Sequence, residues 1–378
     1  MARLILHIGP GKCGSSSIQH FFASYKRPCV QRTRYVLLDP ADLKQLDEDV
    51  PDASIATDFS QQLISYVAGS DVVILSHEYL FQAPYAVRNI CRIAVDQVTA
   101  IAIVGYSRRQ SSFLVSAYSQ WLFRSPQRVQ EVLSVIEDLS LSPLAFTGLE
   151  RQIIASTATD FVSARQLSGQ NILNWQASYS AISQLTGEYG AITKCGVLPT
   201  RASGISLIQD FCEKAELTLR PGVKNAPDKV SNQRFNPDVV EAINSAIALN
   251  LSMPGPHESN RLISVLSSQL LSSSTALDNA QSNQHASPFL TQLKQYVDAY
   301  FLSDNQKLCQ QYGLDEAYFS VTERLSKAEI LEAIASEARS RFANPTTLIQ
   351  DYRSLSAKLI DLCLQLAESS SHSSSLSE

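Results

Sequence analysis

The chain has 378 residues, of which 44% are hydrophobic and only 18% are charged. That apolar content is ordinary for a globular protein with a sizeable core, so a disordered chain is excluded. The 31 basic and 36 acidic residues give a net charge of -5, which excludes a global basic field but allows a local basic pocket. We therefore expect a folded protein with no nucleic-acid partner.

The seven cysteines are scattered along the chain, with no CxxC pair and no Cys/His cluster of the kind that binds zinc. Their odd number and irregular spacing fit reduced thiols in the cytoplasm. The sequence contains no apolar run long enough for a signal peptide or a membrane span. We therefore expect a soluble, cytoplasmic protein.

Short apolar runs alternate with helical patterns along much of the chain. The predicted strands are Leu4–Ile8, Tyr35–Leu38, Val72–Leu75, Ala100–Tyr106 and Ala191–Val197. The predicted helices have apolar residues at helical spacing, over Ser15–Ala23, Ala86–Val98, Phe113–Phe123, Ile205–Ala215 and Asp238–Leu249. Strands that alternate with helices predict the α/β class, with a parallel sheet flanked by helices.

Helical patterns dominate residues 124–184 and 321–368. Ser326 and Glu329 form a capping-box pattern at the start of the C-terminal part. A heptad-like leucine stripe over 348–366 indicates packing onto its own domain or a homodimer through the C-terminal helix. We predict an α/β domain, a helical extension and a disordered Ser-rich tail, over residues 1–320, 321–368 and 369–378.

The most informative segment is a glycine-rich loop between the first predicted strand and the first predicted helix. It begins at Gly9, and its candidate anion-binding residues are Gly11, Lys12, Cys13, Gly14, Ser15, Ser16 and Ser17. Glycines let backbone N–H groups approach an anion, the helix N-terminus adds a positive dipole end, and the lysine and hydroxyls add donors. A plain turn needs neither the lysine nor three serines, so the loop predicts a phosphate or sulfate site.

Two familiar motifs share features with this loop. Gly9, Gly11 and Gly14 satisfy the GxGxxG pattern of dinucleotide-binding enzymes, and Asp39 follows the next predicted strand. A NAD-binding, Rossmann-type oxidoreductase is therefore an alternative. The Walker A pattern of NTPases is not met, because Lys12 precedes the last glycine instead of following it.

The stretch Leu6–Gln19 closely resembles the 5′-phosphosulfate-binding loop of sulfotransferases that use PAPS (3′-phosphoadenosine-5′-phosphosulfate), in particular of their bacterial branch. It departs from that pattern at Cys13, where threonine or serine is common. A second motif resembles the 3′-phosphate site of the same family: a strand leads to Arg108, and Ser116 follows eight residues later on the next helix. An arginine fork and a hydroxyl are suited to bind phosphate.

The resemblance covers residues 3–319 and is specific only in these two motifs. It implies a P-loop-like sulfotransferase fold and transfer of a sulfuryl group from PAPS to a hydroxyl or amine, leaving 3′,5′-ADP and needing no metal. Lys12 would stabilise the developing charge, and Gly11–Ser17, Arg108 and Ser116 would bind the nucleotide. The acceptor stays open between a carbohydrate, which is favoured by analogy, a lipid and a small metabolite. A non-catalytic binding protein on the same scaffold is a further alternative.

A general base is expected where the third predicted strand ends. Glu78 is favoured because the segment resembles a Ser-x-Glu pattern of this branch, although burial would have to raise its pKa. His77 is the rival, and His7 is a weaker one because it lies inside a strand. The aromatic candidates for the acceptor pocket, for which core packing is the alternative, are Tyr118, Trp121 and Trp175.

Overall fold

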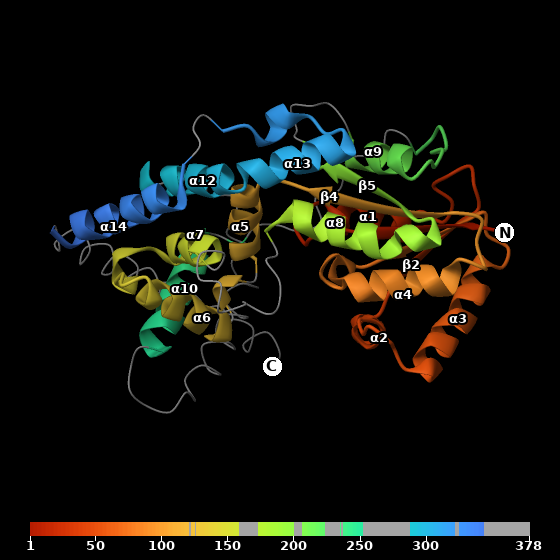
Figure 1. Cartoon of the computed structure of the whole chain (residues 1–378), viewed down its shortest axis with the longest axis horizontal. Helices are drawn as coiled ribbons and strands as arrows, with labels where there is room; N and C mark the ends of the chain where they lie inside the picture. Colours follow the sequence, from red (N-terminus) through yellow and green to blue (C-terminus); the bar gives the residue numbers. More distant parts are fainter. Residues whose placement is uncertain are drawn as a thin grey trace, which may run out of the picture. The chain divides into compact units, whose positions relative to one another are not determined.

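The computed structural model describes residues 1–120, 122–124, 126–158, 173–199, 206–223, 235, 237–251, 288–321 and 325–343 (Figure 1). The chain divides into two units, and each is assembled from three separate stretches of sequence. The first unit comprises Met1–Arg109, Ile172–Asn232 and Phe301–Ser320. The second comprises Gln110–Asn171, Gln233–Tyr300 and Val321–Glu378.

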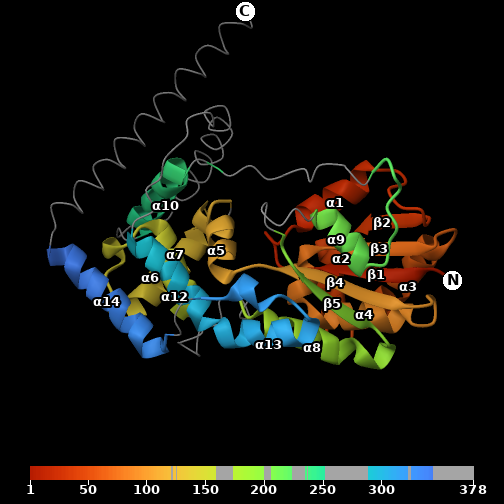
Figure 2. The same ribbon diagram turned by 90° about the horizontal axis from the view of Figure 1, so that it is seen from above.

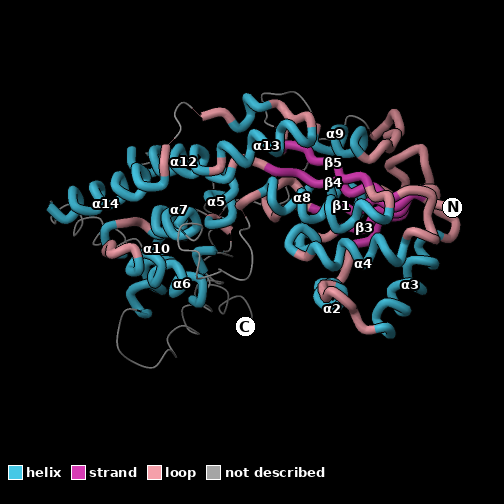
Figure 3. Tube along the Cα trace, in the orientation of Figure 1, coloured by secondary structure: helices cyan, strands magenta, loops and turns pink. Residues whose placement is uncertain are grey.

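The first unit is built on a five-stranded sheet in which every neighbouring pair of strands is parallel. Figure 3 shows the strands of this sheet in magenta. In spatial order the strands are β2 (Thr33–Leu37), β3 (Val72–Ser76), β1 (Arg3–Ile8), β4 (Ile101–Ser107) and β5 (Ile192–Val197). All five lie where the apolar runs predict strands. The predicted α/β class, a parallel sheet flanked by helices, is confirmed.

Helices cover both faces of this sheet (Figures 1 and 2). One face carries α1 (Ser15–Ser24) and α9 (Leu207–Lys214), and the other carries α4 (Pro84–Ala94) and α8 (Trp175–Thr186). The first unit is completed by α2 (Pro40–Leu46), α3 (Ala53–Val67), α13 (Leu302–Tyr312) and the short 3-10 turns η1 (Glu78–Gln82), η4 (Gly187–Tyr189) and η6 (Glu316–Phe319).

Aromatic side chains fill the spaces between the sheet and its helices. On the α1 and α9 face, the ring of Phe211 packs edge-on against His7 at 5.2 Å and against Phe22 at 5.6 Å. On the opposite face, Phe81 packs against Trp175 and Tyr179 at 5.8 and 5.2 Å. Large apolar surface is thus buried on both faces, which explains the continuous apolar runs of β1, β3 and β4.

The helices α2 and α3 of the first unit are not among the predicted elements. Asp39 caps α2 by accepting from the Ala41 N–H at 2.7 Å, and Pro40 occupies the first turn. Asp52 caps α3 in the same way, accepting from the Ser54 N–H at 2.7 Å. An aspartate followed by proline is a helix-start signal as well as a strand-stop signal.

The described residues of the second unit form helices and the turns that connect them, with no strand among them. Its elements are α5 (Gln110–Tyr118), η2 (Leu122–Arg124), α6 (Pro126–Asp138), η3 (Pro143–Ala145), α7 (Gly148–Ala158), α10 (Pro237–Leu251), α12 (Pro288–Tyr300) and α14 (Lys327–Ala343). The predicted capping box opens α14, because Glu329 accepts from the Ser326 N–H at 2.7 Å and the Ser326 hydroxyl accepts from the Glu329 N–H at 3.3 Å.

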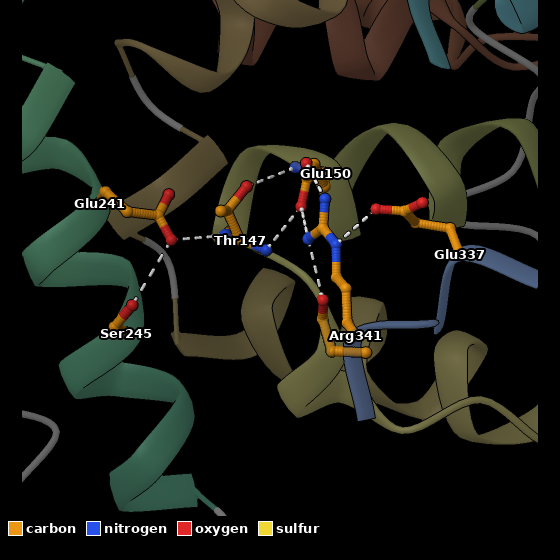
Figure 4. A network of polar contacts seen from close by, with 8 residues as sticks. Thr147, Glu150, Glu241, Ser245, Glu337 and Arg341 are labelled. Carbon is orange, nitrogen blue, oxygen red and sulfur yellow. Dashed lines mark hydrogen bonds and ion pairs between the residues drawn. The ribbon is translucent and has the colours of Figure 1, made fainter. Parts of the chain in front are cut away.

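A polar network ties α14 to the rest of the second unit (Figure 4). The Arg341 guanidinium donates to both carboxylate oxygens of Glu150, at 2.8 and 3.0 Å, and Glu150 is only 1% exposed. The same guanidinium donates to Glu337 at 2.8 Å and to the Ala145 carbonyl at 2.9 Å. This arginine is therefore satisfied by partners within its own unit.

Several predictions fall on other parts of the chain. The heptad-like stripe over 348–366, the tail over 369–378 and Trp121 lie outside the described residues. The division into residues 1–320, 321–368 and 369–378 stays a prediction. Within the described part of the chain, none of the helices has the length and apolar character that crossing a membrane requires.

Candidate functional site

The candidate site lies in the first unit, at the carboxyl ends of three adjacent strands. β1 lies between β3 and β4, and all three run parallel, so the segments that follow them emerge at one edge of the sheet. β1 leads into the glycine-rich loop, β3 leads to His77 and Glu78, and β4 leads to Arg108. In open α/β sheets this edge is where ligands bind.

Backbone geometry explains the glycines of the loop. Gly9 and Gly14 have φ values of 144° and 92°, which suit glycine, and Lys12 also has a positive φ of 68°. A side chain on Gly9 would lie 3.3 Å from the Tyr106 backbone, and one on Gly14 would collide with Leu207. The loop is therefore pressed closely against its surroundings, and α1 begins directly after it.

The N-terminus of α1, directly after the loop, has backbone N–H groups that could donate to an anion. Gly14 is the N-cap and provides no side-chain cap, and its carbonyl accepts from the Ser17 and Ile18 N–H groups at 3.0 and 3.2 Å. Within the described ranges, no protein group accepts from the N–H groups of Gly14 and Ser15. Helix N-termini with such N–H groups are suited to bind anions.

Cys13 contributes backbone rather than thiol chemistry. Its side chain is 2% exposed, and burial raises the pKa of the thiol, so the sulfur stays protonated. Its N–H donates to the Pro10 carbonyl at 3.3 Å, which closes the turn before the helix. The predicted donation of this amide to a nucleotide phosphate would therefore require the turn to open.

Lys12 supplies a positive charge within the loop. The side chain is half-buried, and no described residue forms a hydrogen bond or an ion pair with its ammonium group. Burial lowers the pKa of Lys12, the Glu78 carboxylate partly opposes this shift, and the Arg108 guanidinium lowers the pKa further. An ammonium beside another cation, with no ion-pair partner in the described chain, favours the binding of an anion.

Glu78 and His77 point their functional groups at different partners. The Glu78 carboxylate accepts from the Ser15 hydroxyl at 2.6 Å, and its other oxygen would lie 2.9 Å from a side chain on Gly11. The His77 ring nitrogen Nδ1 accepts from the Tyr79 N–H at 3.0 Å and so caps the turn η1. Burial lowers the pKa of His77. Glu78 thus lies against the anion loop, while His77 is engaged with its own turn.

The two adjacent arginines after β4 have different partners. Arg108 donates from Nη1 to the Lys12 carbonyl at 3.0 Å, and its own carbonyl accepts from the Trp175 indole at 2.8 Å. Arg109 donates from Nε to the Tyr318 carbonyl at 2.7 Å and from Nη2 to the Ser320 carbonyl at 3.2 Å. Arg108 therefore supports the anion loop, and Arg109 holds a distant segment of the chain.

Three further candidates are Ser116 and the aromatic residues Tyr118 and Trp175. Ser116 is half-buried on α5, which belongs to the second unit, so its pairing with Arg108 stays a prediction. Tyr118 is buried in the second unit and donates to Glu241 at 2.9 Å. Trp175 is fully buried in the first unit. These contacts give both aromatic residues a place in the core of their own unit.

His7 is buried beneath the loop and is 2% exposed. Its Nδ1 shares a hydrogen bond with the Ser76 hydroxyl at 2.8 Å, and burial lowers the pKa of the ring to about 3. The ring is therefore neutral near neutral pH and packs in the core, as its position inside a strand predicts.

Comparison with protein-family models and with curated proteins gives no match to this sequence. Among solved structures, the chain is similar to a sulfotransferase from Alicyclobacillus acidocaldarius, with a TM-score of 0.34 and 13% identity over 68% of this chain and 98% of that chain. A likeness this weak carries no argument about activity.

Proposed function

We propose that this chain is a PAPS-dependent sulfotransferase that moves a sulfuryl group to a hydroxyl or amine acceptor. The observation that carries the proposal is the Lys12 ammonium, which has no ion-pair partner among the described residues and lies within an anion loop at a helix N-terminus. Glu78 and Arg108 flank it from the two neighbouring strands. This arrangement combines donors for a phosphosulfate with a carboxylate that can accept a proton.

Sulfuryl transfer, like phosphoryl transfer, depends mainly on in-line positioning and charge neutralisation. A bond forms between sulfur and the acceptor oxygen or nitrogen while the bond from sulfur to the bridging oxygen breaks. The leaving phosphate, now part of 3′,5′-ADP, takes the electron pair of that bond. Lys12 would stabilise the charge developing on the bridging oxygen, and the N–H groups of Gly14 and Ser15 would hold the 5′-phosphate.

The acceptor must also lose a proton, and Glu78 is our candidate for the group that takes it. Its carboxylate is hydrogen-bonded to Ser15 at the start of α1, so it lies at the loop where the sulfuryl group would bind. The Nδ1 of His77 is engaged by the Tyr79 N–H, which leaves only its second nitrogen for such a role. A general base must lie within hydrogen-bond distance of the proton that it takes, and this requirement favours Glu78 over His77.

Strand order counts against the alternative of a NAD-dependent oxidoreductase. In the dinucleotide-binding fold, β2 lies next to β1, and an acidic residue after β2 binds the ribose. Here β3 separates β2 from β1. The Asp39 carboxylate accepts from the Ala41 N–H at 2.7 Å and so caps α2. Asp39 is thus one strand too far from the loop after β1 to bind a ribose there, and its carboxylate already caps α2.

A non-catalytic nucleotide-binding protein on the same scaffold would need the anion loop but no base. The contact between Glu78 and Ser15 places a carboxylate at the loop, where it would repel a bound anion. A purely binding protein gains nothing from such a repulsive group. The presence of Glu78 therefore favours an enzyme over a binding protein.

Calorimetric titration with 3′,5′-ADP and NAD tests the nucleotide class. We expect 3′,5′-ADP to bind at least tenfold more tightly than NAD, and Lys12→Ala to weaken that binding. Lys26→Ala, an exposed lysine just after α1, is the matched control and should change neither affinity. Tighter binding of NAD than of 3′,5′-ADP would refute the proposal.

A further inference from the structure

An aromatic residue from a distant part of the sequence, Tyr318, lies near the candidate site. The turn η6 closes the last segment of the first unit, and Asp315 caps it by accepting from the Ala317 N–H at 2.9 Å. Phe319 is 2% exposed and anchors the turn, while Tyr318 beside it is only half-buried. Phe319 therefore fixes the turn to the core, while the side chain of Tyr318 stays partly accessible.

Arg109 fixes this turn to the end of β4. Its two hydrogen bonds, to the carbonyls of Tyr318 and Ser320, hold the turn from Nε and Nη2 of one guanidinium. A planar guanidinium that donates from two nitrogens fixes both distance and orientation. Because Arg108 is the preceding residue in the chain, Tyr318 is held next to the arginine that contacts the anion loop.

The phenol of Tyr318 interacts electrostatically with both Arg108 and Arg109, and its backbone carbonyl is bonded to Arg109. Burial raises the pKa of Tyr318, the Arg108 guanidinium opposes that shift, and the buried Cys13 side chain adds to it. The hydroxyl is therefore protonated near neutral pH and can donate a hydrogen bond, and it lies within electrostatic range of both Arg108 and the loop.

Arg108 has donors to spare in this position. One of its N–H groups donates to the Lys12 carbonyl, and nothing in the described part of the chain accepts from the others. A phosphate group offers several acceptor oxygens and is typically held by more than one donor. A neutral hydroxyl next to Arg108 would complete such a set without adding charge.

We infer that Tyr318 is a nucleotide-binding residue whose hydroxyl donates to the 3′-phosphate beside Arg108, and that Arg109 is the positioning residue that holds it there. This inference rests on the proposed use of PAPS, because only a nucleotide with a 3′-phosphate would need the second donor. In this inference Arg108 contacts the 3′-phosphate, and Arg109 positions Tyr318.

The test compares 3′,5′-ADP with 5′-AMP, which lacks the 3′-phosphate, by calorimetry on the full chain. Tyr318→Phe removes only the hydroxyl, and we expect it to weaken 3′,5′-ADP about tenfold while 5′-AMP changes less than about twofold. Tyr312→Phe is the matched control, because this tyrosine of the same unit packs against Tyr179 at 5.7 Å, and it should change neither affinity.

Three results would count against the inference. Unchanged binding of 3′,5′-ADP by Tyr318→Phe would overturn it, and so would equal losses for both nucleotides, which indicate stacking or a general structural role. Arg109→Ala should lose the preference for 3′,5′-ADP over 5′-AMP, as Tyr318→Phe does. If Arg109→Ala keeps that preference in full, its positioning role is overturned. If the unmodified protein itself binds the two nucleotides equally, the proposed use of PAPS fails, which is a distinguishable outcome.

Discussion

Two cations that are largely removed from solvent, Arg341 in the second unit and Lys12 in the first, have opposite surroundings. In the second unit, Arg341 is matched by Glu150, Glu337 and a backbone carbonyl, so its charge is neutralised inside the fold (Figure 4). In the first unit, the Lys12 ammonium is half-buried and no described residue pairs with it. A satisfied buried charge stabilises a fold, whereas a cation held without a partner is suited to bind a ligand.

This contrast predicts its largest effect at Lys12. Lys12→Ala should lower kcat by about 100-fold to 1000-fold, because the lysine would stabilise the charge that develops on the bridging oxygen as the bond to sulfur breaks. The free energy of unfolding should not fall, since the side chain has no ion pair to lose among the described residues. Turnover of labelled PAPS and a urea titration measure the two effects. Retention of more than about a tenth of kcat would remove Lys12 from the mechanism.

Replacing Arg341 should lower the stability of the fold, which replacing Lys12 should not do. Arg341→Ala leaves the 1% exposed Glu150 without its bidentate partner, and we expect a loss of about 3 kcal/mol in the free energy of unfolding. The matched control is Arg32→Ala, because Arg32 is 70% exposed in its pair with Asp71 and should matter little. Urea titrations of both variants provide the comparison. Equal stability losses would show that burial does not separate the two pairs.

The base assignment predicts a third, somewhat smaller effect. Glu78→Gln should lower kcat about 100-fold and leave 3′,5′-ADP binding unchanged or tighter, because a carboxylate beside the anion loop is replaced by a neutral amide. His77→Ala should change kcat far less, since His77 caps its own turn. Steady-state kinetics at saturating PAPS distinguish the two. A hundredfold loss in His77→Ala together with an active Glu78→Gln would make the histidine the base.

The smallest of these effects concerns nucleotide discrimination. Arg108→Ala or Ser116→Ala should weaken 3′,5′-ADP by about 1.5–3 kcal/mol and 5′-AMP much less, because each side chain is predicted to contact the 3′-phosphate. Calorimetry with both nucleotides measures the difference. Similar losses for the two nucleotides in Arg108→Ala would instead mean that Arg108 acts through its contact with the Lys12 carbonyl.

Local patterns predicted much of this fold and site because their causes are local. Each strand is a short apolar run bounded by turn residues, so all five could be placed from the sequence. The glycine-rich loop could also be predicted, because the residues that define it are close together in the sequence. The predicted helices omit α2, although the cap Asp39 followed by Pro40 is a helix-start signal.

Contacts between distant residues could not be predicted in this way. Strand order depends on pairings across the whole unit, and it is this order that separates Asp39 from the loop. The sequence offers His77 and Glu78 as neighbours, and only the folded turn shows which of them meets Ser15. Tyr318 lies 209 residues after Arg109, and no local pattern signals their contact.

The most direct test of sulfuryl transfer is incubation of the unmodified protein with sulfur-labelled PAPS and a cell extract as the source of acceptor. We predict a labelled product, identified by mass spectrometry, together with an equal amount of 3′,5′-ADP. Both should disappear in Lys12→Ala and persist in Lys26→Ala. Label transfer that is unaffected by Lys12→Ala, or no transfer by a protein that binds NAD more tightly than 3′,5′-ADP, would contradict the proposed function.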